Sequence, residues 1–196
     1  MAGRATDSLI VAVTGASGAV YAKRLLQILS GTTLRLDLII SRSAAVVMEK
    51  ELGVHVDLVN PDLTPFVGDR VCEYWHFEDI SAPPASGTHP ADAMIVIPCS
   101  MGTLASIANG IANNLIIRAA DVCLKEHRPL LLVPRETPLS LIHLENMVKA
   151  ARAGATIVPA MPAFYHSPDS VEDLVDFVVA RVLNLLGIKH ELRVTM

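Results

Sequence analysis

Residues 9–18, LIVAVTGASG, decide the fold of this chain. The first six, LIVAVT, form a short apolar run rich in β-branched side chains, which is typical of a buried strand. The stretch from Gly15 to Gly18 ends that run, and residues 19–29 then carry apolar side chains at helical spacing. A strand, a tight turn and a helix in this order form the first unit of a parallel α/β sheet.

The same alternation continues to the end of the chain. Apolar runs predict further strands at residues 34–40, 93–98, 129–134 and 156–159. Helical spacing predicts helices at residues 43–52, 103–112, 114–126, 139–153 and 170–186. Residues 54–90 are rich in proline and weakly patterned, so we expect a long, loop-rich excursion there. The chain is therefore predicted to have an α/β fold, a doubly wound parallel sheet of the Rossmann or flavodoxin-like kind, in one domain (residues 1–196, core about 9–187).

Composition narrows the class of protein. Of the 196 residues, 52% are hydrophobic but only 4% are aromatic, so the apolar surface is aliphatic and exceeds what one core needs. We expect the surplus to be buried between copies in a homo-oligomer. A net charge of −4 and the lack of a basic stripe argue against nucleic acid. No apolar run approaches the roughly 18 residues that span a membrane, so no membrane partner is expected.

Cysteine usage indicates the compartment and the absence of a metal site. The three cysteines are odd in number and widely spaced, which suits a reducing, cytoplasmic location rather than a disulfide framework. The sequence contains no CxxC or HExxH spacing, so we expect no metal. A free Cys99 after an apolar strand is more often a small buried hydrophobe than a nucleophile.

Polar and small residues follow the predicted strands where ligands bind in such sheets. Ligands lie beyond the carboxyl ends of parallel strands, so segments that follow different strands should share one crevice. The loop at residues 161–166, after the last strand, should join them. The four segments expected to converge are Gly15–Gly18, Ser41 with Arg42, Cys99–Thr103, and Arg135 with Glu136.

Two of these segments favour a ligand that carries a phosphate. In Gly15–Gly18 the small residues let backbone N–H groups approach an anion at the positive end of a helix, although a plain tight turn is the alternative. Cys99–Thr103 offers hydroxyls and N–H groups at a second strand-to-helix junction, although Ser100 could be only an N-cap. Two such junctions facing one crevice suit a phosphate joined to a polar ring, and flavin mononucleotide (FMN) fits that description.

Charged and phenolic side chains are candidates for the chemistry. Glu136 is the best candidate for a general acid or base. Alternatively, its carboxylate could only stabilise the start of a helix through the helix dipole. Tyr165 could offer its phenol to a ligand or be a buried tyrosine with a satisfied hydroxyl. Basic residues on helices usually form a solvated surface. Arg135 differs, because it directly follows a predicted strand and must therefore lie at the crevice. The candidate anion binders are Arg118, Lys125, Arg135 and Arg181.

Taken together, these stretches closely resemble the flavin prenyltransferase family, the UbiX/Pad1-like proteins. The resemblance runs in order from about residue 9 to residue 187. The matching stretches are 14–18 (TGASG), 82–87 (APPASG), 98–104 (PCSMGTL), 118–122 (RAADV), 124–126 (LKE), 134–138 (PRETP), 143–147 (HLENM), 162–166 (PAFYH) and 173–181 (DLVDFVVAR).

The resemblance implies an enzyme that joins a dimethylallyl group from dimethylallyl monophosphate to N5 and C6 of reduced FMN, without metal. The product, prenylated FMN, would serve a UbiD-like partner decarboxylase. The family commonly forms dodecamers. By resemblance, Glu136 would transfer a proton, and Tyr165 and Arg181 would bind the prenyl donor, with Arg118 and Lys125 at its phosphate. FMN would be held by Gly15, Ala16, Ser17, Ser41, Ser100, Met101, Gly102, Thr103 and Arg135.

The sequence departs from the family pattern at two places. Many relatives have a Trp just before the Pro-Pro-Ala-Ser-Gly stretch, where this chain has Ile80 and Ser81. Some relatives carry a Trp in a C-terminal extension, whereas this sequence ends at Thr195-Met196 without an aromatic residue. Both departures concern how the allyl group is shielded and which donor, monophosphate or diphosphate, is preferred.

Two other functions are open to a flavin-binding α/β chain. An FMN-dependent decarboxylase of the cysteine-decarboxylase type would use a His in its first helix region, but no His precedes His55 here. Such an enzyme would also carry a Pro-Ala-Ser-Ala-Asn-type strand end, where this chain has Pro98-Cys99-Ser100-Met101. A non-catalytic flavin-binding subunit of a decarboxylase complex would have no use for Lys125, Glu136 and Tyr165 together.

Overall fold

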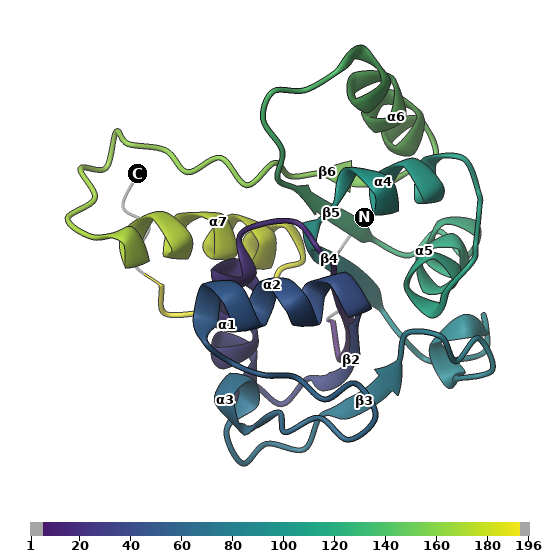
Figure 1. Ribbon diagram of the computed structural model, residues 1–196, viewed down its shortest axis with the longest axis horizontal. Coiled ribbons are helices and arrows are strands. Elements are labelled where there is room, and N and C mark those ends of the chain that lie inside the picture. Colours follow the sequence, from purple (N-terminus) through teal and green to yellow (C-terminus); the bar gives the residue numbers. More distant parts are fainter. Residues whose placement is uncertain (1–5, 193–196) are drawn as a thin grey trace.

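The centre of the protein is a six-stranded sheet, seen in the computed structural model, which describes residues 6–192 (Figure 1). The strand order is β3-β2-β1-β4-β5-β6, and every neighbouring pair is parallel. The strands are β1 Ser8–Val13, β2 Arg35–Ile40, β3 Glu73–His76, β4 Ala93–Cys99, β5 Leu130–Pro134 and β6 Thr156–Ile157. The predicted doubly wound parallel sheet is confirmed. Thr195-Met196, in the tail, lies outside the described residues.

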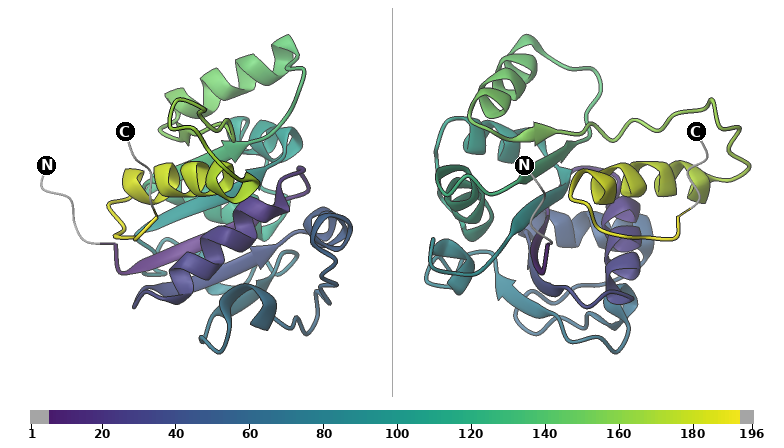
Figure 2. Two further views of the ribbon diagram at one scale, coloured as in Figure 1. Left: turned by 90° about the vertical axis from the view of Figure 1, so that its left-hand side faces the viewer. Right: turned by 180° about the vertical axis from the view of Figure 1, so that it is seen from behind.

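Helices cover both faces of the sheet, as the views in Figure 2 show. Alternate residues of β1 point to opposite faces: Leu9, Val11 and Val13 pack in one core cluster, while Ile10 and Ala12 pack in the other. The first cluster is closed by α1 Ala19–Ser30, α2 Arg42–Leu52, α3 Thr64–Val67 and α7 Val171–Leu185, and the second by α4 Met101–Ala108, α5 Leu115–Lys125 and α6 Leu141–Arg152. Among residues 6–192, no helix is both long and apolar enough to cross a membrane.

The strand order reverses between β1 and β4, and ligands bind beyond the carboxyl ends of strands at such a switch point. A buried threonine joins the two loops there. The Thr14 hydroxyl donates to the Pro98 carbonyl at 2.7 Å, and it accepts the N–H of Ser100 at 2.7 Å. The two junctions singled out in the sequence, after β1 and after β4, are therefore neighbours.

The excursion at residues 54–90 contains more regular structure than its sequence pattern predicts. It holds α3, the edge strand β3 and a short 3-10 turn, Pro83–Ala85. β3 pairs with β2 from Asp37 opposite Glu73 to Ile40 opposite His76. Its residues, EYWH, are only partly buried or exposed, so no apolar run reveals the strand. Tertiary pairing with β2 creates it.

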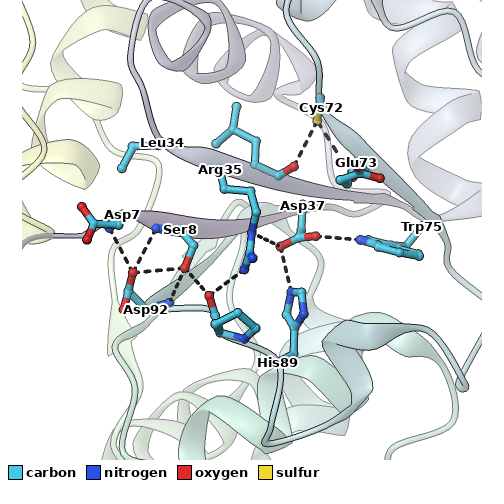
Figure 3. Close-up of polar contacts among 12 residues, drawn as sticks. Asp7, Ser8, Leu34, Arg35, Asp37, Cys72, Glu73, Trp75, His89 and Asp92 are labelled. Carbon is cyan, nitrogen blue, oxygen red and sulfur yellow. Dashed lines mark hydrogen bonds and ion pairs between the residues drawn. The ribbon is translucent and has the colours of Figure 1, made fainter.

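A buried carboxylate links this excursion to the sheet through hydrogen bonds (Figure 3). Asp37 of β2 is 1% exposed, and it accepts the indole N–H of Trp75 at 2.8 Å. The same carboxylate lies 2.9 Å from Nε2 of His89, which precedes β4, and 3.9 Å from Nε of Arg35. Arg35 also donates to the Pro90 carbonyl at 2.6 Å. One side chain thus connects β2, β3 and the end of the excursion.

Replacing Asp37 by Ala is expected to lower the free energy of unfolding by about 3 kcal/mol, because it removes a buried carboxylate that the partly buried Trp75 and His89 contact. Urea unfolding followed by the fluorescence of Trp75, the single Trp of the chain, measures the loss. Asp69→Ala, at an exposed carboxylate, is the control and should cost little. A loss below about 1 kcal/mol for Asp37→Ala would show that the cluster contributes little beyond ordinary packing.

Candidate active site

Three helices begin at the carboxyl edge of the sheet around the switch point. Ser41 caps α2 by accepting the N–H of Ala44 at 3.1 Å, and its own N–H donates to the Val13 carbonyl at 3.0 Å. Ser100 caps α4 by accepting the N–H of Thr103 at 3.3 Å. With α1, these helices direct their positive ends toward the end of β1 and β4, which favours an anion there.

The turn after β1 keeps its own donors available. Within residues 6–192, the backbone N–H groups of Gly15, Ala16 and Ser17 donate to no protein acceptor. Gly15 is required by a close approach, because a Cβ at this position would lie 2.3 Å from Cβ of Ser43 in α2. A larger residue would therefore push α2 away from the turn.

Gly15→Ala is expected to weaken flavin binding and to cost about 1–3 kcal/mol of stability, since overpacking forces the backbone to shift. Fluorescence titration with FMN and thermal unfolding measure the two effects. Gly31→Ala is the matched control: its added Cβ would meet only the Ile28 carbonyl, at an ordinary 3.6 Å. If both variants bind FMN equally, the turn does not need this close approach.

Arg135 connects the far side of the crevice to the same turn. Its Nε donates to the Ser17 carbonyl at 3.1 Å, so the loop after β5 lies against the loop after β1. The segments Gly15–Gly18, Ser41, Cys99–Thr103 and Arg135 thus follow strands that end at the same edge of the sheet, and the Arg42 guanidinium pairs with Glu78 at 3.1 Å. Glu136 follows directly and is exposed, and its Oε1 accepts the N–H of Thr137 at 2.9 Å.

A carboxylate that sequence reasoning missed lies at the start of α1. Glu51 accepts the N–H of Gly18 at 2.9 Å and of Ala19 at 2.8 Å. Partial burial would raise the pKa of this carboxyl, but hydrogen bonds from the Ser17 hydroxyl and these two N–H groups, with the charge of Arg135, outweigh it and lower the pKa. The N–H of Gly18, one of the turn residues expected to meet a ligand phosphate, is therefore already paired with an internal anion.

Glu51 could not have been selected from the sequence. It follows Glu49 and Lys50 near the end of α2, where any charged residue reads as solvated helix surface. The helix runs from Ser41, at the end of β2, to the start of α1, and only that tertiary path brings the carboxylate to the turn.

Cys99 is adjacent to the crevice but is not a nucleophile. Its side chain is fully buried, and burial raises the pKa of the thiol to about 12. At neutral pH almost none of it is thiolate, the reactive form. The prediction of a small buried hydrophobe at this position is confirmed.

The residues expected at the prenyl donor lie on the connection after β6 and on α7. Tyr165 is 70% exposed, and its ring contacts those of His166 and Phe177, the latter in α7. Arg181 is exposed one turn after Phe177, about 15 Å along the helix from Val171. The loop at residues 161–166 leaves the sheet at the Pro134 carbonyl, which accepts the N–H of Ala160, and then turns to α7 (Figure 1).

Lys125 and Arg118 belong to α5. Lys125 ends α5 near the amino end of β5, so the five residues of that strand, about 16 Å, separate it from the crevice. Arg118 contacts Asp121 at 2.7 Å and the Ala85 carbonyl at 3.2 Å. Lys125 therefore lies near the opposite edge of the sheet from Arg135. Arg118 lies in the first turn of α5, which begins where the N–H of Leu115 donates to the Phe77 carbonyl, just after β3.

Comparison with known proteins identifies the family. The chain matches the Flavoprotein family over residues 4–183. It is 50% identical over 192 residues to the flavin prenyltransferase UbiX of Pseudomonas aeruginosa, covering 95% of this chain and 92% of that protein. The chain belongs to the flavin prenyltransferase family. It is 46% identical over 184 residues to UbiX of Methanothermobacter thermautotrophicus, with 94% of this chain and 92% of that protein covered. The protein is thus a prenyltransferase, as the sequence resemblance implies.

Solved structures of relatives share the fold over most of the chain. A dodecameric FMN-dependent UbiX-like decarboxylase from Escherichia coli O157:H7 has a TM-score of 0.86 and 46% identity, covering 93% of this chain and 96% of that one. AnUbiX (PadA1), in complex with FMN and dimethylallyl pyrophosphate, has a TM-score of 0.86 and 42% identity over 95% and 94% of the two chains. The peptidyl-cysteine decarboxylase EpiD has a TM-score of 0.60 at 17% identity over 92% and 98%, which shows the fold alone.

Proposed function

We propose that the crevice binds FMN through Gly15–Ser17, Ser41, Ser100–Thr103 and Arg135. The observation that carries this proposal is the meeting of unpaired N–H donors, three helix N-termini and Arg135 at the switch point of the sheet. Both the E. coli relative, described as FMN-dependent, and the FMN complex of AnUbiX support it. Glu51 accepts the N–H groups at the end of the turn, those of Gly18 and Ala19. The N–H groups of residues 15–17 remain available to the ligand.

The proposed reaction transfers a dimethylallyl group from dimethylallyl monophosphate to N5 and C6 of reduced FMN. The C–O bond of the allylic ester breaks, its electron pair leaves with the phosphate, and the freed allylic carbon bonds to N5, which loses its proton. Protonation of the remaining alkene then lets its far carbon bond to C6, which loses its proton in turn. Cations placed at the leaving phosphate stabilise the charge that develops there, which can suffice without a metal for a monophosphate. The AnUbiX complex with dimethylallyl pyrophosphate supports the class of donor.

Glu136 is proposed as the proton-transfer group. It follows Arg135, which lies against the turn, and its carboxylate is exposed at the same edge of the sheet. From there it could protonate the leaving phosphate, or the phosphate itself could remove the C6 proton. Holding donor and flavin together supplies much of the rate, because it converts a bimolecular step into a local one.

The donor's phosphate is proposed to meet Tyr165, Arg181, Arg118 and Lys125 of neighbouring subunits. The exposed side chains of Tyr165 and Arg181, and the position of Lys125 at the amino end of β5, support this assignment. The outer face of α6 carries exposed Leu141, Ile142, Leu144 and Val148, an apolar surface that a homo-oligomer would cover. The dodecameric state of the E. coli relative supports a dodecamer here.

The product is proposed to serve a UbiD-like decarboxylase, in the cytoplasm.

Neither alternative function is favoured by a feature of the site. The cysteine-decarboxylase type shares the fold alone, and a non-catalytic subunit does not fit a chain that is 50% identical to a flavin prenyltransferase.

The choice of donor has a direct test. Reduced FMN and the protein are incubated anaerobically with either dimethylallyl monophosphate or the diphosphate, and the initial rates of flavin consumption are compared. The proposal expects faster turnover with the monophosphate. If only the diphosphate reacts, or if the rate falls when a chelator is added, the metal-free monophosphate reaction is wrong for this protein.

A further inference from the structure

Tyr165 stands on a tight turn that projects from the protein. The N–H of Ser167 donates to the Phe164 carbonyl at 3.0 Å, and Ser167 has a φ of 52°. This places Tyr165 and His166 at the two central positions of a four-residue turn. The connection between β6 and α7 that carries them extends to one side of the sheet in Figure 1 and in the right view of Figure 2. A tyrosine in such a place needs support to keep one orientation.

His166 supplies that support through a stack of rings. Its imidazole lies flat on the ring of Phe177, with centroids 5.3 Å apart and an interplanar angle of 6°. The ring of Tyr165 meets both partners edge-on, at 5.8 Å and 80° from His166 and at 6.2 Å and 86° from Phe177. Phe177 packs on the main core cluster, so it anchors the stack to the body of the protein. Edge-on and stacked pairs of this kind stabilise beyond their buried area.

The ring of His166 is well packed, but one of its nitrogens lacks a hydrogen-bond partner. Within residues 6–192, Nδ1 is the one buried side-chain nitrogen or oxygen that has no hydrogen-bond partner. A buried polar atom without a partner destabilises the folded state. Asp173, in the first turn of α7, accepts the N–H groups of Asp169 at 2.9 Å and Ser170 at 3.0 Å, and hydrogen bonds from these two residues lower the pKa of its carboxyl. His166 therefore contributes to the stack through the flat shape of its ring and not through a hydrogen bond from Nδ1.

We propose that His166 is a positioning residue for Tyr165, holding the phenol in the orientation that meets the prenyl donor. The inference rests on the proposed function, in which Tyr165 contacts that donor. Without the stack, the tyrosine would be ordered only on binding, and immobilising such a side chain at that moment weakens binding by about five- to tenfold.

Four variants of the full-length protein test the inference: His166→Ala, His166→Phe, Tyr165→Phe and the double variant His166→Ala/Tyr165→Phe. For each, KM for dimethylallyl monophosphate, kcat and the Kd of FMN are measured. His166→Ala is expected to raise KM for the donor about five- to tenfold while the Kd of FMN is unchanged. His166→Phe keeps the flat ring and is expected to restore KM to within about twofold of the wild type. His190→Ala, at an imidazole that contacts the exposed Asn184, is the control.

The double variant separates this inference from the proposed function. If His166 acts through Tyr165, the effects are not additive, and His166→Ala changes little once the phenol is gone. If Tyr165→Phe retains full activity, the role of Tyr165 in the proposed function is wrong. If Tyr165→Phe is impaired but His166→Ala has normal kinetics, or if His166→Phe is as impaired as His166→Ala, then positioning by the ring is overturned. Additive losses would overturn it as well.

Discussion

Glu136→Gln is expected to slow prenyl transfer about 100-fold or more and to leave the Kd of FMN unchanged. Gln has the shape of Glu but cannot take up or release a proton, so only the proton-transfer step loses its group. The carboxylate is exposed and bonds only the neighbouring N–H of Thr137 among described residues, so the change should not disturb the fold. Single-turnover reaction of the bound reduced flavin measures the rate.

Glu145→Gln, at an exposed carboxylate of α6, is the matched control and should react at the wild-type rate. A normal rate for Glu136→Gln would remove this residue from its proposed role. The most direct replacement would then be Glu51, whose lowered pKa keeps it charged beside Ser17 and Arg135. Loss of FMN binding in Glu136→Gln would instead make it a binding residue.

Lys125→Ala is expected to be about as impaired as Glu136→Gln in a uniform oligomer, because a cation is missing at the developing phosphate charge. When the two variants are co-assembled, activity should return to about a quarter of the wild-type level, since about a quarter of the sites then pair an intact Glu136 with an intact Lys125 from a neighbour. The effect follows from the position of Lys125 at the amino end of β5, away from its own crevice.

Co-expression with two affinity tags isolates the mixed oligomers for this measurement. Oligomers that mix Lys125→Ala with the wild type control for assembly. If mixed oligomers of the two variants are no more active than either variant alone, Lys125 and Glu136 do not serve a shared site between subunits. Full activity of Lys125→Ala by itself would remove the lysine from the site.

The sequence predicts the parts of the protein that depend on local pattern. β1, β4 and β5 are continuous apolar runs, and parallel strands buried on both faces have this pattern. The capping box at Ser170 and Asp173 correctly marks the start of α7. The crevice residues were also predictable, because topology forces whatever follows each parallel strand to the same edge.

Features that depend on tertiary contacts were not predictable. β3 exists through its pairing with β2, and Glu51 reaches the start of α1 only because α2 crosses the end of the sheet. Motifs also carry no information on whether one chain or several supply the residues of a site.

The direct test of the central claim is the mass of the flavin released after anaerobic incubation of the protein with reduced FMN and dimethylallyl monophosphate. The account predicts FMN enlarged by one isoprenyl unit, with nothing formed when the protein or the donor is left out. Only unmodified FMN, with the monophosphate and the diphosphate both tried as donors, would contradict it.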